Sequence, residues 1–356
     1  MDCLIVGGGL IGLLCARELA REGATVRVID KGVAGREASW AGGGILSPLY
    51  PWRYPAPVTA LARWSQARYE KFLRQLKEET GVDPQWERSG LLILDTGERE
   101  SAQAWAIGNG VSLQLLEGAS IMRCEPALED TWSEALWLPE VAQLRNPRLL
   151  KALKLSLMRD EVELTEHTEV NRLLQDGGQV KGVETASGRL LADRVILTAG
   201  AWSGTLLHGL RKVEPVQGQM VAFRALPGLL SRIVLNRGYY VIPRNDGVIL
   251  AGSTVEYRGF DKGVTAEGRE QLRTEALKMV PALAEHPLVH HWAGLRPGSQ
   301  EGIPLIGEHP RIGGLFINTG HFRNGVVTAL ASARLLTDLI VGRKPIVIPD
   351  PYGILE

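Results

Sequence analysis

The 356-residue sequence predicts an α/β fold with a second α+β domain built on an antiparallel sheet. Residues 2–30 read as an apolar strand, a glycine-rich turn, a helix and a second strand, which is the pattern of a βαβ unit. Strand-rich blocks at about 85–140 and 215–290 interrupt the α/β material twice. We therefore expect a first domain from residues 1–84, 141–214 and 291–356, and a second domain from residues 85–140 and 215–290.

The opening unit has the spacing of a dinucleotide-binding turn. Gly7 lets the chain turn sharply out of the first strand, Gly9 lets the backbone approach a pyrophosphate, and Gly12 lets the helix pack on the sheet. The helix N-terminus offers unpaired N–H groups to phosphates. Asp30 ends the second strand, where a carboxylate accepts hydrogen bonds from a ribose diol. A dinucleotide site is favoured over a merely structural glycine-rich turn.

A glycine-rich loop follows at residues 36–46. Three consecutive glycines, Gly42, Gly43 and Gly44, leave a chain that stays floppy unless something packs on it. A flat ring lying against the backbone would order such a loop. The alternative is an ordinary solvent loop, but Trp40 and Ile45 are poor residues to leave in water.

The remaining elements follow from periodicity and from turn residues. The expected helices are an amphipathic one that contains residues 61–76 and ends at Gly81, and others near 97–109, 146–158, 267–280 and from Gly325. The expected strands are 91–94, 135–138, 161–164, 169–174, 180–184, 194–197, 216–223, 232–241 and 248–254, with a hairpin turn at residues 245–247. The strand at 194–197 leads into a small-residue turn that is expected beside the first one, so Gly200 is a further candidate at the nucleotide.

Composition excludes several other classes of protein. The 40 basic and 40 acidic residues cancel without a long block of either sign, which argues against a nucleic-acid surface. Cys3, Cys15 and Cys124 are too scattered for a disulfide framework or a zinc site, and the first two are expected to be small buried side chains. His290 and His291 lack a complete ligand set nearby, so no metal is expected.

The predicted location is cytoplasmic. The first strand begins at residue 2, which leaves no room for a cleaved signal peptide. The best membrane candidate, residues 326–341, is short for a span and carries Arg334 and Asp338. We therefore expect no membrane contact.

Four motifs in order carry a resemblance. These are the glycine turn at residues 7–12, Arg36-x-x-Ser39 with its glycine-rich sequel, the Gly-Leu-Arg-Pro at 294–297 and the Gly-His-Phe-Arg-Asn-Gly at 320–325. Over essentially its full length the chain resembles the D-amino-acid-oxidase-type FAD oxidoreductases, and more narrowly their glycine oxidase branch in thiamine biosynthesis. The resemblance implies a Rossmann-like FAD-binding domain of the GR2 type and a substrate domain on an antiparallel sheet. No cysteine follows Cys124, so FAD is expected to bind without a covalent link.

The resemblance also implies which residues meet the cofactor. They form the pyrophosphate turn, the ribose carboxylate, the loop on the isoalloxazine, the adenine contact and the segment around the pyrimidine end of the flavin. With Gly200 they are Gly7, Gly9, Leu10, Ile11, Gly12, Asp30, Lys31, Ala38, Ser39, Gly43, Gly44, Ile45, Val170, His321, Phe322, Arg323, Asn324, Gly325, Val326 and Val327.

Three side chains are expected to bind substrate. Arg296 matches the arginine that binds the substrate carboxylate, a task that suits a planar guanidinium with two parallel N–H donors. Tyr240 fits the tyrosine that donates a second hydrogen bond; Tyr239 is the alternative, because a strand sends only one of two neighbours to a given face. Arg323 is a second cation near substrate or flavin. The alternatives to a role in substrate binding are a surface salt bridge for Arg296 and packing within its loop for Arg323. Val255 and Ile45 are expected pocket walls.

The implied activity is FAD-dependent oxidative deamination of glycine, or of small amines such as sarcosine or D-alanine. Dioxygen as acceptor would give the imine or glyoxylate, ammonia and hydrogen peroxide, and the imine would supply thiazole formation. No catalytic side chain is assigned, because the cofactor supplies the redox chemistry. A homo-oligomer, a homotetramer by the resemblance, is expected. The alternatives are a dehydrogenase subunit of the same fold with a non-oxygen acceptor, and a catalytically silent flavin-binding subunit.

Overall fold

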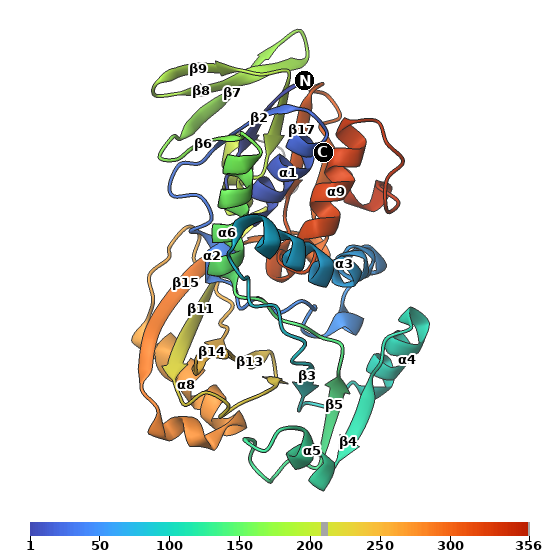
Figure 1. Ribbon diagram of the computed structural model, residues 1–356, viewed down its shortest axis with the longest axis vertical. Helices are drawn as coiled ribbons and strands as arrows, with labels where there is room; N and C mark the ends of the chain where they lie inside the picture. The colour runs from blue at the N-terminus through green and yellow to red at the C-terminus, as the bar shows by residue number, and fades with distance from the viewer. Residues whose placement is uncertain (208–212, 355–356) are drawn as a thin grey trace.

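The computed structural model describes residues 1–207 and 213–354. Residues 208–212 and 355–356 belong to the ranges predicted for the first domain and lie outside the described residues. Figure 1 shows the six-stranded sheet with α1 and α9 in one half of the molecule, and β11, β13 and β14 with α8 in the other.

The first half is built on a six-stranded sheet of order β16-β17-β10-β1-β2-β6. The four pairings from β17 to β6 are parallel, and β16 joins the edge antiparallel. The strands are β1 (Asp2–Val6), β2 (Thr25–Ile29), β6 (Glu163–Thr165), β10 (Arg194–Leu197), β16 (Leu305–Glu308) and β17 (Leu315–Thr319). The predicted βαβ opening is therefore confirmed.

Both faces of this sheet are covered, which explains why β1 is apolar throughout. Cys3 and Ile5 pack into a core with the helices, whereas Leu4 and Val6 point to the opposite core beneath a three-stranded antiparallel sheet. The helices are α1 (Leu10–Arg21), α3 (Ala56–Thr80), α6 (Asn146–Arg159) and α9 (Ala329–Ile340), and the small sheet is β7 (Val170–Asp176), β8 (Gln179–Thr185) and β9 (Gly188–Leu191). Cys3 and Cys15 are fully buried, as predicted.

The second half is built on an eight-stranded sheet of order β15-β11-β14-β13-β12-β3-β5-β4. Its pairings are antiparallel except for β12 with β3. The strands are β3 (Leu91–Ile93), β4 (Gln114–Glu117), β5 (Glu134–Leu138), β11 (Glu214–Arg224), β12 (Ile233–Asn236), β13 (Tyr239–Pro243), β14 (Val248–Gly252) and β15 (Leu288–Gly298). The remaining helices are α2 (Ala38–Ala41), α4 (Arg99–Asn109), α5 (Ala119–Cys124), α7 (Ser203–Leu206) and α8 (Ala266–Met279).

Strands from both predicted blocks thus share one sheet. The expected boundary between residues 290 and 291 falls inside β15, and residues 291–298 pair with β11. A strand cannot be divided between two sheets without losing its ladder, so this part of the chain extends the second sheet. The division into two domains stays a prediction.

Other elements differ from the expected pattern in ways that have a local cause. The run at 232–241 is two strands, because Arg237 and Gly238 both take positive φ (48° and 84°) and form a two-residue hairpin turn. The sequence carries only Gly238 as a signal for it. The last helix begins at Ala329 rather than Gly325, since residues 322–324 first form a 3₁₀ turn. The short elements β4, β9 and α5 carry too little periodicity to be predicted.

Candidate cofactor- and substrate-binding site

A cavity of about 560 Å³ is lined by residues from both large sheets. Twenty of the predicted site residues line it. They are Gly7, Gly9, Leu10, Ile11, Asp30, Lys31, Ala38, Ser39, Gly43, Gly44, Ile45, Val170, Gly200, Tyr240, Arg296, His321, Phe322, Arg323, Gly325 and Val326. Residues far apart in the sequence therefore meet at one place.

Four expected positions lie elsewhere. Gly12, Asn324 and Val327 are buried but are not among the lining residues. A Cβ on Gly12 would lie 2.0 Å from the Gly7 carbonyl oxygen, so this glycine serves the packing of helix on strand. Val255 is 41% exposed and does not line the cavity, so the expectation that it forms a pocket wall is wrong. It follows β14 in a segment whose next residue, Glu256, pairs with Gln217 of β11.

The glycine turn after β1 has the shape that an anion needs. Gly7 has φ +106°, and a Cβ there would lie 2.5 Å from the Thr198 carbonyl oxygen. Gly9 caps α1, and the Leu10 amide donates to Ser39 Oγ at 2.8 Å. In the described chain the Ile11 amide has no acceptor, so it is available to a pyrophosphate at a helix N-terminus.

Asp30 is held in place by main-chain amides. Its Oδ2 accepts from the Gly8 amide at 2.7 Å and its Oδ1 from the Gly32 amide at 2.8 Å. Each carboxylate oxygen accepts more than one hydrogen bond, so both keep capacity for a ribose hydroxyl. Beside it, the Lys31 ammonium lies 3.7 Å from the ring centre of Trp202, and burial lowers the Lys31 pKa.

The glycine-rich loop packs tightly against neighbouring segments of the chain on the side away from the cavity. A Cβ on Gly43 would lie 2.6 Å from Ile242 Cδ1, and one on Gly44, whose φ is +77°, would lie 2.1 Å from the Leu144 carbonyl oxygen. The Leu144 amide also donates to the Gly44 carbonyl at 2.9 Å. The alternative of an ordinary solvent loop is therefore wrong. The three glycines at 42–44 line the cavity with main chain alone, which suits a flat ring system.

Arg296 projects from β15 into the cavity. Its Nη1 donates to the carbonyl oxygens of Gln217 at 3.2 Å and Thr254 at 3.1 Å, and its Nη2 donates to Ser253 Oγ at 2.8 Å. In the part of the chain that the structure describes, no carboxylate forms an ion pair with Arg296. Burial lowers its pKa to about 10. A surface salt bridge is thus excluded, and Nε and one Nη2 N–H remain for a ligand.

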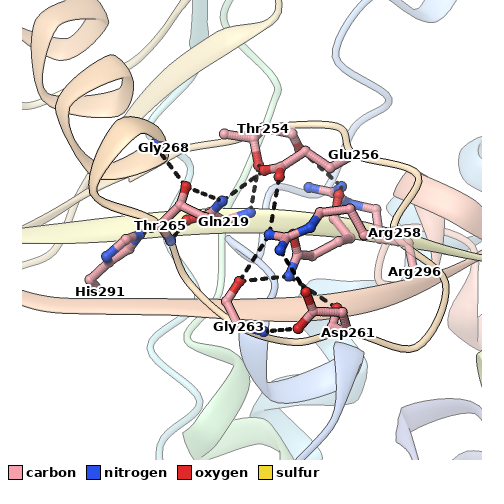
Figure 2. A network of polar contacts seen from close by, with 11 residues as sticks. Gln219, Thr254, Glu256, Arg258, Asp261, Gly263, Thr265, Gly268, His291 and Arg296 are labelled. Carbon is pink, nitrogen blue, oxygen red and sulfur yellow. Dashed lines mark hydrogen bonds and ion pairs between the residues drawn. The ribbon is translucent and has the colours of Figure 1, made fainter.

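A polar network stands behind this guanidinium (Figure 2). Thr254, whose carbonyl faces Arg296, donates its hydroxyl to Glu256 Oε1 at 2.6 Å and accepts from the Gln219 amide at 2.9 Å. His291 Nε2 lies 2.9 Å from Gln219 Oε1. The histidine thus belongs to this network, which fixes the carbonyl that orients Arg296.

The two adjacent tyrosines of β13 face opposite ways. Tyr240 lines the cavity and its hydroxyl donates to Met220 Sδ at 3.7 Å. Tyr239 lies on the other face, where its hydroxyl accepts from Gln271 Nε2 at 2.6 Å. Of the two, only Tyr240 lines the cavity. Arg323 lines the same cavity and donates to the Gly238 carbonyl at 3.4 Å.

His321 braces the segment that precedes α9. Its Nε2 lies 2.9 Å from Asn318 Oδ1 and its Nδ1 lies 3.1 Å from Thr328 Oγ1. Burial lowers the His321 pKa to about 3, so the ring is neutral near pH 7. Its position supports the backbone of residues 321–325 rather than a proton transfer.

Several lining residues were not predicted from the sequence. They include Trp202, Gly218, Met220 and Ser253. A Cβ on Gly218 would lie 2.0 Å from Arg296 Nη2, so the guanidinium occupies the space of the missing side chain. A glycine inside an apolar strand signals such a close approach, but it does not say what approaches. Ser253 carries no comparable signal.

A dinucleotide turn that shares a cavity with an unpaired guanidinium defines an enzyme that uses a dinucleotide cofactor on a small anionic substrate. Residues 2–339 match the family model described as FAD dependent oxidoreductase (DAO), and the chain belongs to this FAD-dependent family. The motifs had predicted both the family and the cofactor. The glycine turn, Asp30 and the three glycines at 42–44 fit FAD.

Particular relatives narrow the comparison. The chain is 49% identical to a glycine oxidase of Pseudomonas aeruginosa over 354 residues, which covers 98% of this chain and 97% of that protein. Among solved structures it resembles the glycine oxidase of Geobacillus kaustophilus, with a TM-score of 0.94 and 31% identity, covering 99% of this chain and 98% of that one. The glycine oxidase of Bacillus cereus gives a TM-score of 0.91 at 32% identity, covering 98% and 97%. The predicted fold class is therefore confirmed.

Two findings complete the site. No helix within the described residues has the length and apolarity needed to cross a membrane. Over the same residues, no three His, Cys, Asp or Glu side chains are grouped in a way that could hold a metal ion.

Proposed function

We propose that this protein is an FAD-dependent oxidase of glycine and of similarly small amino acids. The single observation that carries the proposal is the guanidinium of Arg296, which lies in the cofactor cavity without a carboxylate partner among the described residues. A cation in that situation needs an anion, and the substrate carboxylate supplies it. The 49% identity to a protein named glycine oxidase supports glycine as that substrate.

The side chains act by binding and orienting. Arg296 grips the carboxylate through its remaining N–H groups, Tyr240 donates a second hydrogen bond, and Arg323 adds positive charge to the same space. When bound, FAD would supply the acceptor for the hydride that leaves the substrate Cα. The lone pair of the neutral amine would assist that departure and give the protonated imine, which releases its proton to water, so a protein base is not required.

Finer parts of the function belong to the same proposal. Dioxygen as the electron acceptor gives hydrogen peroxide, and hydrolysis of the imine gives glyoxylate and ammonia. Supply of the imine to thiazole formation, a cytoplasmic location and a homotetramer stay predictions. Among the curated relatives, a bifunctional ThiO/ThiG protein of Nostoc is 33% identical to this chain over 349 residues, and it supports the link to thiamine.

The test is a spectrum of the purified holoprotein. We expect the flavin absorbance to disappear when glycine is added without air and to return, with one peroxide per glyoxylate, when air is admitted. Sarcosine and D-alanine added in parallel rank the substrates. A flavin that stays oxidised with all three amino acids would overturn the proposal, and bleaching that air does not reverse would point to a non-oxygen acceptor.

A further inference from the structure

Arg244 is a second arginine without a carboxylate partner, at the end of the strand that carries Tyr240. It follows β13 directly and is 8% exposed. Because alternate residues of a strand share a face, Arg244 lies on the same side as Tyr240 and Ile242. That side is the one against which the glycine-rich loop packs, since a Cβ on Gly43 would touch Ile242.

Its guanidinium donates hydrogen bonds to that loop and to the segment beside it. Nη2 donates to the Gly43 carbonyl at 2.7 Å, and Nη1 donates to the Leu144 carbonyl at 3.0 Å and to Gln143 Oε1 at 2.5 Å. Leu144 is in turn bonded through its amide to the Gly44 carbonyl. One planar group therefore ties two chain segments, about a hundred residues apart, to the end of a third.

The charge itself is unpaired. Among the described residues no carboxylate forms an ion pair with Arg244, and the nearby Asp246 pairs instead with Arg145 at 2.7 Å. Burial lowers the Arg244 pKa to about 10. Placing an unpaired cation in the interior is costly, and an apolar side chain would fill the space at less cost. The hydrogen bonds to the Gly43 and Leu144 carbonyls therefore explain why an arginine is buried at this position.

We propose that Arg244 is a positioning residue. It fixes the position of the glycine-rich loop against the flavin, and it couples that loop to the strand bearing Tyr240. The fork of the guanidinium fixes the Gly43 carbonyl, and with it the surface of residues 42–45 that lines the cavity. The inference rests on the proposed function in one respect, namely that the flavin lies against this loop.

The experiment compares three variants as apoproteins titrated with FAD. Arg244→Met removes the charge and the fork, and Arg244→Lys keeps the charge without the planar fork. Arg145→Met is the matched control, because it removes a neighbouring cation that bonds to Asp246 and Gln85 but not to the loop. We expect the dissociation constant for FAD to rise about tenfold in Arg244→Met and less in Arg244→Lys, with a shifted visible flavin spectrum in both. Arg145→Met should match the wild type.

The readouts separate positioning from general stability. Thermal unfolding of each apoprotein measures the loss of stability without FAD. A positioning role requires that FAD affinity and the flavin spectrum change in a variant whose apoprotein keeps most of its stability. If Arg244→Met does not fold, Arg244→Lys carries the test. Wild-type FAD affinity and spectrum in Arg244→Lys, or equal weakening in Arg145→Met, would overturn the inference. Failure of the proposed function shows earlier and differently, as a wild-type protein that does not bind FAD or does not react with glycine.

Discussion

The two ends of the cavity are built by opposite means. At the proposed cofactor end much of the surface is main chain, formed by a glycine turn, a helix N-terminus and the three glycines of the loop. At the proposed substrate end it consists of side chains, namely two arginines and a tyrosine that reach in from β13, β15 and the segment before α9. Under the proposed function the first surface binds by shape and phosphate charge, whereas the second binds one small anion.

This difference separates two kinds of residue requirement. At the cofactor end a residue is needed because nothing larger fits, so its replacement disturbs folding or cofactor binding. At the proposed substrate end a residue is needed for the group that it offers to the ligand, as with Arg296, which has no carboxylate partner among the described residues, so its replacement disturbs substrate binding with FAD retained. The variants below test that separation.

The largest effect is expected from Arg296→Met. The KM for glycine should rise about 100-fold to 1000-fold, because truncating one partner of a desolvated, hydrogen-bonded charge pair typically costs on the order of 2–5 kcal/mol. FAD content and its spectrum should stay as in the wild type. Steady-state kinetics and the flavin absorbance of the same preparation measure both. Arg296→Lys, which keeps the charge, should recover part of the affinity, and an unchanged KM in both variants would remove Arg296 from the site.

Gly9→Ala tests the cofactor end. The Gly9 backbone at φ −72° accepts any residue, and its Cβ would meet only Ser39 Oγ at 3.2 Å, so the apoprotein should keep its Tm. FAD binding should weaken by about tenfold or more, because the methyl group occupies the approach of the pyrophosphate.

Gly12→Ala provides the contrast within the same turn. Its Cβ would lie 2.0 Å from the Gly7 carbonyl oxygen, so this variant should lose stability by about 1–3 kcal/mol even without FAD. Apoprotein melting and FAD titration distinguish the two outcomes. Equal melting losses in both variants would contradict the division of roles.

The sequence was informative where a requirement is local and less so where it is not. The turn at Gly7, Gly9 and Gly12 lies in one short segment, so together with its strand, its helix and the carboxylate that follows it indicated a dinucleotide site. Arg296 was found through the motif around it. Ser253 and Gly218 were missed because their roles depend on the approach of Arg296 from another strand, which no local pattern records. The hairpin at Arg237 and Gly238 was missed for want of a stronger turn signal.

Gly218→Ala should disturb the substrate end without changing any of its functional groups. The added Cβ would lie 2.0–2.3 Å from the guanidinium atoms of Arg296, which is the movable end of a long side chain. The arginine should therefore shift while the fold persists, and the KM for glycine should rise about tenfold. The control is Gly108→Ala on α4, where a Cβ meets nothing within 4 Å. A normal KM in Gly218→Ala would mean that the site tolerates a displaced guanidinium.

The two tyrosines offer a matched pair on one strand. Tyr240→Phe removes a hydroxyl that faces the cavity, and the KM for glycine should rise about threefold to tenfold, because one hydrogen bond typically contributes on the order of 1 kcal/mol. Tyr239→Phe removes a hydroxyl bonded to Gln271 on the far face, and its KM should equal that of the wild type. Parallel kinetics on both variants measure the contrast. The reverse order of effects would assign the substrate contact to Tyr239.

The smallest effect concerns the pH dependence of carboxylate binding. Burial lowers the pKa of Arg296 to about 10, so the guanidinium is charged below that pH and loses its proton above it. Acetate, which has no amine to titrate, should inhibit equally from pH 7 to 9, and its inhibition constant should double at about pH 10 and then rise about tenfold per pH unit. Arg296→Met is the control, because it removes the group that loses its proton. A rise of the inhibition constant with pH that persists in that variant would come from another group and would contradict the assignment to Arg296.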